Sequence, residues 1–304
     1  MNKPMNKKTL KLTVIITVIL LIFSQYSDYF TEKNEHSAST ELLTVINNIK
    51  ITNPKPREHI RIMSYNLLSD SLGFEGTDVK IRADGVCNLL NELGADVIGL
   101  QETSRNWHTC IDEKTNYSFI SPIRTKLFGT MTSVIYNKNT LTLLKSGEKV
   151  FNHGYDSRLR RMVWGIFKYN ENGKVFAVIN THFSLSNNNI TTPMNQAAEL
   201  LAFGEKLREE YNCPVFFIGD FNARERNTNT NISSSVYETL STTINDAKGD
   251  AQSVSGGVNQ SIYASSNDHI FIKGNAEIKN YVILSQNEFT NLSDHYPIFV
   301  DIVM

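Results

Sequence analysis

From residue 60 onward, short apolar runs alternate with segments whose apolar residues recur at helical spacing. The apolar runs are rich in β-branched residues, and this pattern predicts strands. Helical spacing from Ala83 to Leu93 predicts a helix that stops at Gly94, and the same spacing from Met194 to Leu207 predicts a second helix. The predicted strands are residues 60–65, 97–100, 131–136, 162–167, 175–181, 215–218, 269–272 and 296–302.

This succession of strands with interspersed helices predicts an α/β fold in which two mixed sheets pack face to face with helices outside. The chain has no internal repeat of solenoid period. Polar tracts at residues 186–192 and 224–235 follow predicted strand ends. Loops that line active sites are often found at such ends, although a plain solvated loop explains either tract equally well.

The N-terminal segment has the pattern of an export signal. Four lysines within the first eleven residues precede an apolar run from Leu12 to Phe23 that only two threonines interrupt. Such a pattern is typical of a secretory signal, and the run is shorter than the roughly 20 residues of a full membrane span. Extended to Leu10 and Tyr26, it would instead form an uncleaved signal anchor. We therefore expect a protein that is secreted or anchored to the membrane by its N-terminus, with the remainder outside the cytoplasm.

Three regions follow from these patterns. Residues 1–30 are predicted to be a signal peptide or signal anchor, and residues 31–58 a polar linker in which Pro54 and Pro56 mark a break. Residues 59–304 are predicted to form one folded domain, which is long enough to bury a full core.

Charge and cysteine content narrow the possible functions. The chain has 30 basic and 31 acidic side chains, so the whole molecule lacks the basic surplus that is typical of proteins that track along nucleic acids. Its three cysteines are widely spaced, which excludes a disulfide framework and a zinc site built on paired cysteines. Cys87 lies on the apolar face of a predicted helix, where it is expected to be a small buried hydrophobic residue.

Polar side chains of a few kinds stand at six predicted strand edges. Each by itself has a simple explanation as a turn residue, a helix cap or a hydrogen-bonded core histidine. Polar groups at several strand ends can, however, meet in one crevice, and this convergence favours a functional site. The residues are Asn66, Gln101 with Glu102, Asn180 with His182, Asp220 with Asn222, Asp268, and Asp294 with His295.

This set of side chains suits the attack of water on phosphorus. Mg²⁺ prefers carboxylate and amide oxygens, neutralises phosphate charge and stabilises the leaving oxygen. A histidine oriented by a carboxylate can take the proton of the attacking water near neutral pH. Glu102, Asp220, Asp294 and His295 provide these parts.

Six short motifs also appear in the order found in a known family, and the chain resembles the endonuclease/exonuclease/phosphatase superfamily from Arg61 to Val303. The resemblance implies a four-layered α/β/β/α sandwich and Mg²⁺- or Mn²⁺-dependent hydrolysis of a phosphate ester. The motifs are Ser64-Tyr65-Asn66, Gly99-Leu100-Gln101-Glu102, Asn180-Thr181-His182, Gly219-Asp220-Phe221-Asn222, Asn267-Asp268-His269-Ile270 and Ser293-Asp294-His295-Tyr296-Pro297.

The resemblance also implies a role for each site residue. Metal ligands would be Asn66, Glu102 and Asp294. Catalytic residues would be His182, Asp220, Asn222, Asp268 and His295, with the identity of the general base left open. Asn180 and Arg161 would contact substrate, although a solvated arginine explains Arg161 equally well.

The identity of the substrate stays open between nucleic acid, a phospholipid headgroup and a small organic phosphate. Leu67 and Leu68 stand where abasic-site repair enzymes of the superfamily usually carry an acidic residue, and His182 stands where they tend to use tyrosine, which argues against that activity. The alternative is a surface binding module that kept the fold and lost catalysis. Retention of Glu102, Asp220 and His295 argues against this alternative. The membrane is an expected partner only if the N-terminal segment is uncleaved, and no protein partner is inferred.

Overall fold

The computed structural model describes residues 55–70, 78–121, 131–152, 160–185, 190–225, 234–256, 267–284 and 292–304. The predicted signal segment and most of the predicted linker lie outside these residues, so both stay predictions, as does the domain boundary at residue 59. Within the described ranges, no helix is both long and apolar enough to cross a membrane.

The first sheet has seven strands and is mixed, because β1 runs parallel to β2 and antiparallel to β13. In spatial order its strands are β10 (Ser253–Gly256), β12 (Glu277–Ile283), β13 (Ile298–Val303), β1 (Ile60–Asn66), β2 (Val97–Gln101), β4 (Thr132–Tyr136) and β3 (Ser118–Phe119).

The second sheet has six strands and is also mixed, because β7 and β8 are parallel and the other neighbours are antiparallel. In spatial order its strands are β5 (Leu141–Val150), β6 (Arg161–Tyr169), β7 (Val175–His182), β8 (Val215–Asp220), β11 (Asp268–Lys273) and β9 (Asn245–Asp246).

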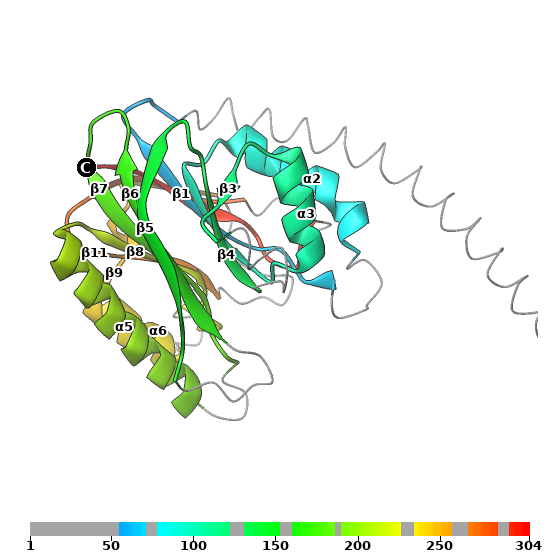
Figure 1. Cartoon of the computed structure of the whole chain (residues 1–304). Helices are drawn as coiled ribbons and strands as arrows, with labels where there is room; N and C mark the ends of the chain where they lie inside the picture. The colour runs from blue at the N-terminus through cyan, green and yellow to red at the C-terminus, as the bar shows by residue number, and fades with distance from the viewer. Residues whose placement is uncertain are drawn as a thin grey trace, which may run out of the picture.

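Helices cover the outer face of each sheet, as Figure 1 shows. Helices α2 (Val79–Leu93) and α3 (Arg105–Lys114) share an apolar core with the first sheet. Helices α5 (Thr191–Tyr211) and α6 (Ser235–Thr243) share another with the second sheet, and α7 (Ala247–Asp250) is a single turn. A further apolar core fills the space between the sheets, with side chains such as Ile62, Val178 and Ile218. The predicted four-layered α/β/β/α sandwich is therefore confirmed.

Local signals fix the limits of the helices. Asp78 caps α2 by accepting a hydrogen bond from the Lys80 backbone amide, and Gly94 ends this helix with a φ of 56°. Glycine adopts this left-handed conformation at little cost, and so the predicted stop is confirmed. The side chain of Ser104 caps α3 by accepting a hydrogen bond from the Trp107 backbone amide.

Several elements were not predicted from the sequence, and most of them have a weak apolar pattern. Strand β5 lies at a sheet edge, and most of its side chains are exposed or half-buried. Helix α3 buries only Trp107, His108 and Ile111. Strand β12 and helix α6 were missed as well. Periodicity detects an element through its buried face, and β5, α3 and α6 bury too little to show one, while the buried residues of β12 do not alternate regularly with exposed ones.

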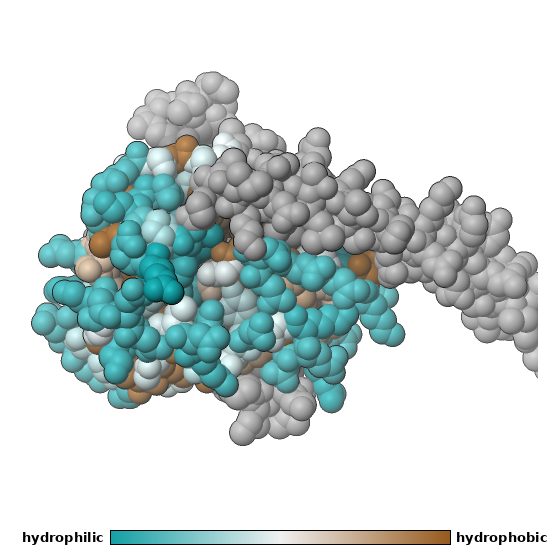
Figure 2. Space-filling model, turned by 90° about the horizontal axis from the view of Figure 1, so that it is seen from above, coloured by the Kyte–Doolittle hydropathy of each residue, from teal (hydrophilic) through white to brown (hydrophobic). Residues whose placement is uncertain are grey.

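The outer surface is mainly hydrophilic. The face seen in Figure 2 is largely polar, with apolar residues scattered among polar ones. The exposed large apolar side chains include Ile81 on α2, Leu144 on β5 and Val254 on β10, which belong to separate elements. Single exposed apolar residues of this kind are ordinary on a folded domain.

A buried ion pair fastens the first sheet at the start of β1. The guanidinium of Arg61 donates two hydrogen bonds to the carboxylate of Asp301 on β13, at 2.7 and 2.9 Å, and a third to the Leu93 carbonyl at 2.9 Å. It also lies 4.2 Å from the ring centre of Phe299. Since both charged groups are almost fully buried, loss of either one would leave an uncompensated charge in the interior.

We expect Arg61→Met to lower the free energy of unfolding by about 3–5 kcal/mol, because the Asp301 carboxylate would be buried without its partner. The double variant Arg61→Met/Asp301→Leu should recover part of this loss. Urea unfolding measures both. Lys145→Met serves as the control, because its exposed pair with Glu210 should contribute little. A double variant as unstable as Arg61→Met would contradict this explanation.

Candidate active site

The register of the second sheet places three predicted catalytic residues side by side. His182 at the end of β7 is opposite Asp220 at the end of β8, and Asp220 is opposite Asp268 at the start of β11. All three side chains are buried, and Nε2 of His182 lies 3.4 Å from Oδ2 of Asp220. Two carboxylates and an imidazole therefore share one sheet edge.

The first sheet contributes predicted metal ligands from the ends of two parallel strands. Asn66 ends β1, opposite Gln101 on β2, and Glu102 follows directly. The Asn66 amide donates a hydrogen bond of 3.0 Å to Oδ2 of Asp220 and so joins the edges of the two sheets. The Glu102 carboxylate accepts a hydrogen bond of 2.8 Å from the Ser69 backbone amide.

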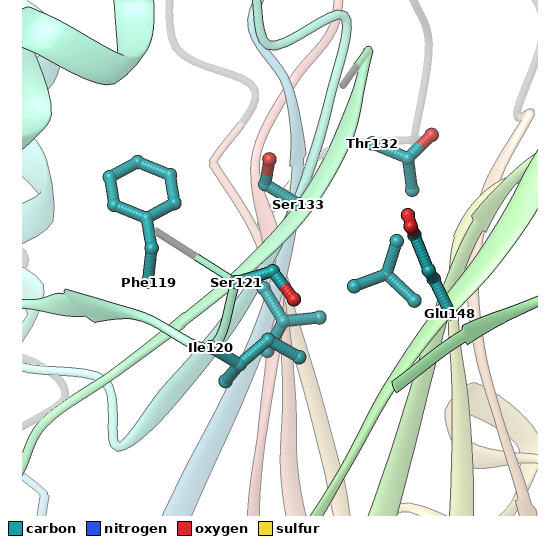
Figure 3. A pocket seen from close by; sticks show the side chains of 8 residues that line it. Phe119, Ile120, Ser121, Thr132, Ser133 and Glu148 are labelled. Atoms are coloured by element: carbon teal, nitrogen blue, oxygen red, sulfur yellow. The ribbon is translucent and has the colours of Figure 1, made fainter. Parts of the chain in front are cut away.

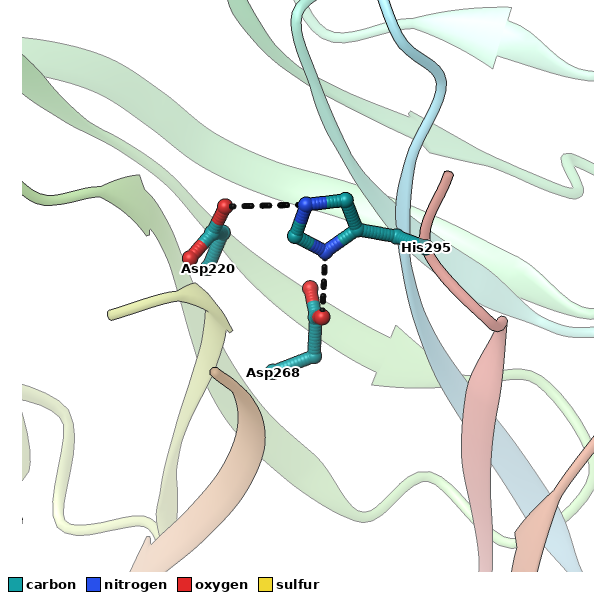
Figure 4. A group of neighbouring side chains, drawn as sticks. All are labelled: Asp220, Asp268 and His295. Carbon is teal, nitrogen blue, oxygen red and sulfur yellow. Dashed lines mark hydrogen bonds and ion pairs between the residues drawn. The ribbon is translucent and has the colours of Figure 1, made fainter. Parts of the chain in front are cut away.

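His295 precedes β13 and projects into the second sheet's row of acidic groups. Its Nδ1 lies 2.6 Å from Oδ2 of Asp268, and its Nε2 lies 3.8 Å from Oδ2 of Asp220, as Figure 4 shows. One ligand atom from each of these three residues lies within 4.8 Å of the others, which is close enough for a metal ion to bind all three. The same arrangement can orient an imidazole for proton transfer.

Burial and nearby charges shift the pKa of His295 in opposite directions. Burial by itself lowers the pKa of this imidazole, but the carboxylates of Asp268 and Asp220 outweigh burial and raise it to about 10. Burial also raises the pKa of Asp220, with a further contribution from Asp268, while the charge of His295 opposes the change. The centre therefore keeps a proton on His295 near neutral pH, and a cation bound beside it would favour release of that proton.

Asp294 and Glu102 make the neighbouring part of the site suitable for a hard cation. Burial raises the pKa of Asp294, and the nearby negative charge of Glu102 raises it further. The carboxylates of Asp294 and Glu102 repel one another, and together with the amide of Asn66 they supply oxygen ligands that a divalent cation prefers. A bound cation would relieve the repulsion. The residues predicted as metal ligands thus fit Mg²⁺ or Mn²⁺ by their chemistry.

Strained backbone is concentrated in the loops of the site. Leu68, Glu102 and Asn222 all have positive φ angles, 56°, 57° and 48°. Such conformations are costly for residues other than glycine and persist where surrounding contacts enforce them. For Asn222 these contacts are its backbone amide on Oδ1 of Asp220 at 2.9 Å and its side-chain amide on the Phe183 carbonyl at 2.8 Å.

Asn180 lies between the sheets and not on the open side of the site. Its amide donates to the carbonyls of Leu100 and Ser133 at 2.9 and 2.7 Å, and its oxygen accepts from Gln101 at 2.7 Å. The side chain is fully buried. This placement favours a role in holding the sheets together over the predicted contact with substrate.

Arg161 lies beside the site, since β6 begins next to the end of β7. Its guanidinium is mostly buried and donates a hydrogen bond of 2.9 Å to Glu148 on β5. Glu148 and Thr132 border a crevice of about 10 Å³ between the sheets, shown in Figure 3. That volume holds one water molecule at most, so a phosphate ester does not fit there. Contact between Arg161 and substrate stays a prediction.

One supporting residue was present in the sequence motifs without an assigned role. The Ser293 hydroxyl donates a hydrogen bond of 2.6 Å to the Asn66 carbonyl and accepts one of 3.2 Å from the His295 backbone amide. It thereby joins the end of β1 to the loop before β13. Its position two residues before His295 was the only sequence signal, and serine is too common in loops for that signal to define a role.

The fold and the site together define an α/β sandwich whose two sheets meet at a buried centre of carboxylates, amides and imidazoles. Solved structures share this architecture. The endonuclease/exonuclease/phosphatase of Bacteroides vulgatus is 22% identical, with a TM-score of 0.69 over 81% of this chain and 99% of that one. The mannosyl-6-phosphatase of Bacteroides thetaiotaomicron is 21% identical, with a TM-score of 0.67 over 81% and 100%. The catalytic domain of human Nocturnin is 17% identical, with a TM-score of 0.62 over 82% and 95%.

A family model identifies the chain more directly. The model of the endonuclease/exonuclease/phosphatase family matches residues 63–295, and the chain belongs to this family. Its members act on phosphate esters as phosphatases and nucleases and generally use divalent metal ions. No curated protein sequence matches the chain.

The pKa of His295 predicts how stability depends on pH in the metal-free protein. The folded pKa of about 10 exceeds the ordinary value of 6.5, so this stabilisation is complete below pH 6.5 and is lost as pH rises through 10. We expect the free energy of unfolding of Asp268→Asn to fall less between pH 7 and pH 10 than that of the wild type, by about 1.4 kcal/mol for each unit by which the variant lowers the His295 pKa.

Urea unfolding of both proteins in EDTA measures this difference. Lysines and tyrosines titrate in the same range, but they are common to both proteins and cancel in the comparison. Equal pH slopes in wild type and Asp268→Asn would show that Asp268 does not hold the proton on His295.

Proposed function

We propose that the chain is a hydrolase of phosphate esters that depends on Mg²⁺ or Mn²⁺ and acts outside the cytoplasm. The observation that supports this most strongly is the meeting of two sheet edges through Asn66 and Asp220, with the Asp268–His295 pair beside them. This contact gathers oxygen ligands for a cation and an oriented imidazole in one place.

In this proposal Asn66, Glu102 and Asp294 hold the cation. When bound, the cation neutralises phosphate charge and stabilises the departing oxygen. A cation held by these residues would also offset the mutual repulsion of Asp220 and Asp268, whose carboxylates are buried side by side.

The other residues handle water, protons and the phosphate group. Asp220 accepts hydrogen bonds from Asn66 and from the Asn222 backbone, which fixes its carboxylate in position to orient the attacking water. His295, held by Asp268, exchanges a proton through Nε2, the nitrogen that faces Asp220. In this proposal His182 donates a hydrogen bond to a phosphoryl oxygen, and Asn222 contacts the phosphate.

The substrate is a phosphate ester of a class that the fold by itself leaves undefined. One structural neighbour is a mannosyl-6-phosphatase, and another binds a sulfate anion, which has the shape of phosphate. These neighbours support sugar phosphates as the first substrates to assay. The near-neutral charge gives no support for long nucleic acids as substrates.

We expect purified protein with Mg²⁺ or Mn²⁺ to hydrolyse at least one member of a panel of DNA, RNA, sphingomyelin, inositol phosphates and sugar phosphates. EDTA should abolish this activity and added metal restore it. Glu102→Gln and His295→Ala should each lower kcat/KM by about 10²–10⁴, the range typical of lost acid–base or metal assistance.

Glu205→Gln is the matched control for Glu102→Gln, because Glu205 is a carboxylate on α5 that pairs only with the partly exposed Arg208 in the described structure. It should keep wild-type kcat/KM. If no panel member were cleaved while the protein bound one of them, the chain would be a binding module that kept the fold.

Location outside the cytoplasm rests on the N-terminal segment of the sequence. We expect a reporter fused after residue 58 to be exported, and a fusion that lacks residues 1–30 to remain inside the cell, because the basic and apolar pattern would be lost. Fractionation of the full-length fusion then separates cleavage from anchoring, since only an anchored chain stays with the membrane. Export of both fusions, or of neither, would contradict the proposal.

A further inference from the structure

Arg82 on α2 holds together two loops that carry site residues. Its guanidinium donates to the carbonyls of Leu67 and Leu68, both at 2.6 Å, in the loop directly after Asn66. It also donates to the Leu292 carbonyl at 2.7 Å, in the loop that leads to Asp294 and His295. The residue is almost fully buried, 3% exposed. Because a guanidinium offers five donors in a rigid plane, one side chain can fix both loops.

Trp107 on α3 completes this contact. Its ring centre lies 4.9 Å from the guanidinium carbon of Arg82, and its Nε1 donates a hydrogen bond of 3.1 Å to the same Leu68 carbonyl. Leu68 has a φ of 56°, so its carbonyl is held by two donors at a point where the backbone is strained. The two outer helices thereby determine the conformation of the loop after β1.

The fixed loop in turn orients the proposed metal ligands. The Leu68 backbone amide donates to Oδ1 of Asn66 at 3.1 Å, and the Ser69 amide donates to the carboxylate of Glu102 at 2.8 Å. On the other loop, Asp294 is close enough for its charge to act on Arg82. A chain of contacts therefore leads from Arg82 to all three ligands, while Arg82 lies behind them in the core.

We propose that Arg82, with Trp107, is a positioning residue that sets the affinity of the site for its divalent cation. This inference rests on the proposed function, since it requires a cation at Asn66, Glu102 and Asp294. Arg82 touches no substrate in this arrangement. Partners that orient metal ligands typically change metal affinity by about 10–100-fold when they are removed.

Arg61 offers a matched control at the start of β1, the end of this strand away from Asn66. It is also 3% exposed, also donates to a backbone carbonyl, and also lies over an aromatic ring, that of Phe299. Its contacts lead to Asp301 and not to the site. Arg61→Lys and Arg82→Lys keep a positive charge and lose the planar fork at equally buried positions, so they separate a loss of general stability from a loss of ligand orientation.

The test is direct Mn²⁺ binding to the full-length chain, followed by the electron paramagnetic resonance signal of free Mn²⁺, together with urea unfolding of each variant. We expect Arg82→Lys to weaken Mn²⁺ binding by about 10–100-fold and Arg61→Lys to leave it unchanged, although both lower the unfolding midpoint. Trp107→Phe, which removes the Nε1 donor, should weaken binding in the same direction by less. This variant keeps the proposal testable if Arg82→Lys does not fold.

A spectroscopic signal gives a second readout. In a Trp164→Phe background Trp107 is the only tryptophan, and Mn²⁺ should change its fluorescence because the cation would bind to ligands that the loop contacted by Trp107 orients. If the wild type bound Mn²⁺ and the folded variants bound it with the same affinity, this inference would be overturned and the proposed function would stand. A wild-type chain that binds no Mn²⁺ would overturn both.

Discussion

The hydrogen bond from Asn66 on β1 to Asp220 on β8 joins the two sheets through strands that are far apart along the chain. Every other feature of the site depends on this contact, because neither sheet edge holds a complete set of ligands and proton carriers. The first sheet brings Glu102 and, next to β13, His295, while the second brings the buried carboxylates of β8 and β11. The apolar core between the sheets fixes their separation, and the buried amide of Asn180 on β7 bonds across to the first sheet near the same end.

Burying several charged side chains together raises the free energy of the folded state. Asp220 and Asp268 are almost fully buried beside one another, and burial of carboxylates raises free energy unless an opposite charge or hydrogen bonds compensate. His295 supplies part of that compensation, and its raised pKa is the consequence. The strained backbone at Leu68, Glu102 and Asn222 adds to the cost. Features that lower stability, such as buried charges and strained backbone, are thus gathered at the site, as expected where selection acts on chemistry.

The outer helices do more than cover the sheets. Helix α2 contributes a buried arginine that donates hydrogen bonds to carbonyls in the loops next to the site. Helix α3 contributes the tryptophan packed against this arginine. In contrast, the ion pair of Arg61 and Asp301 holds β1 to β13 far from the chemistry. Two buried arginines, one on β1 and one on α2, thus have different roles, and their surroundings, not their residue type, decide which.

The sequence by itself determined the fold class, most strands, two helices and the set of residues at the strand ends, because buried faces leave a periodic pattern and strand ends leave short motifs. Among the elements that it missed, α3, β5 and α6 have buried faces too small to show that pattern, and β12 lacks a regular alternation of buried residues. Only the tertiary structure decided which strand ends meet, that Asn180 lies between the sheets, that Arg161 pairs with Glu148, and that Arg82 supports the ligand loops. These facts depend on contacts between residues distant along the chain, and no local pattern encodes such contacts.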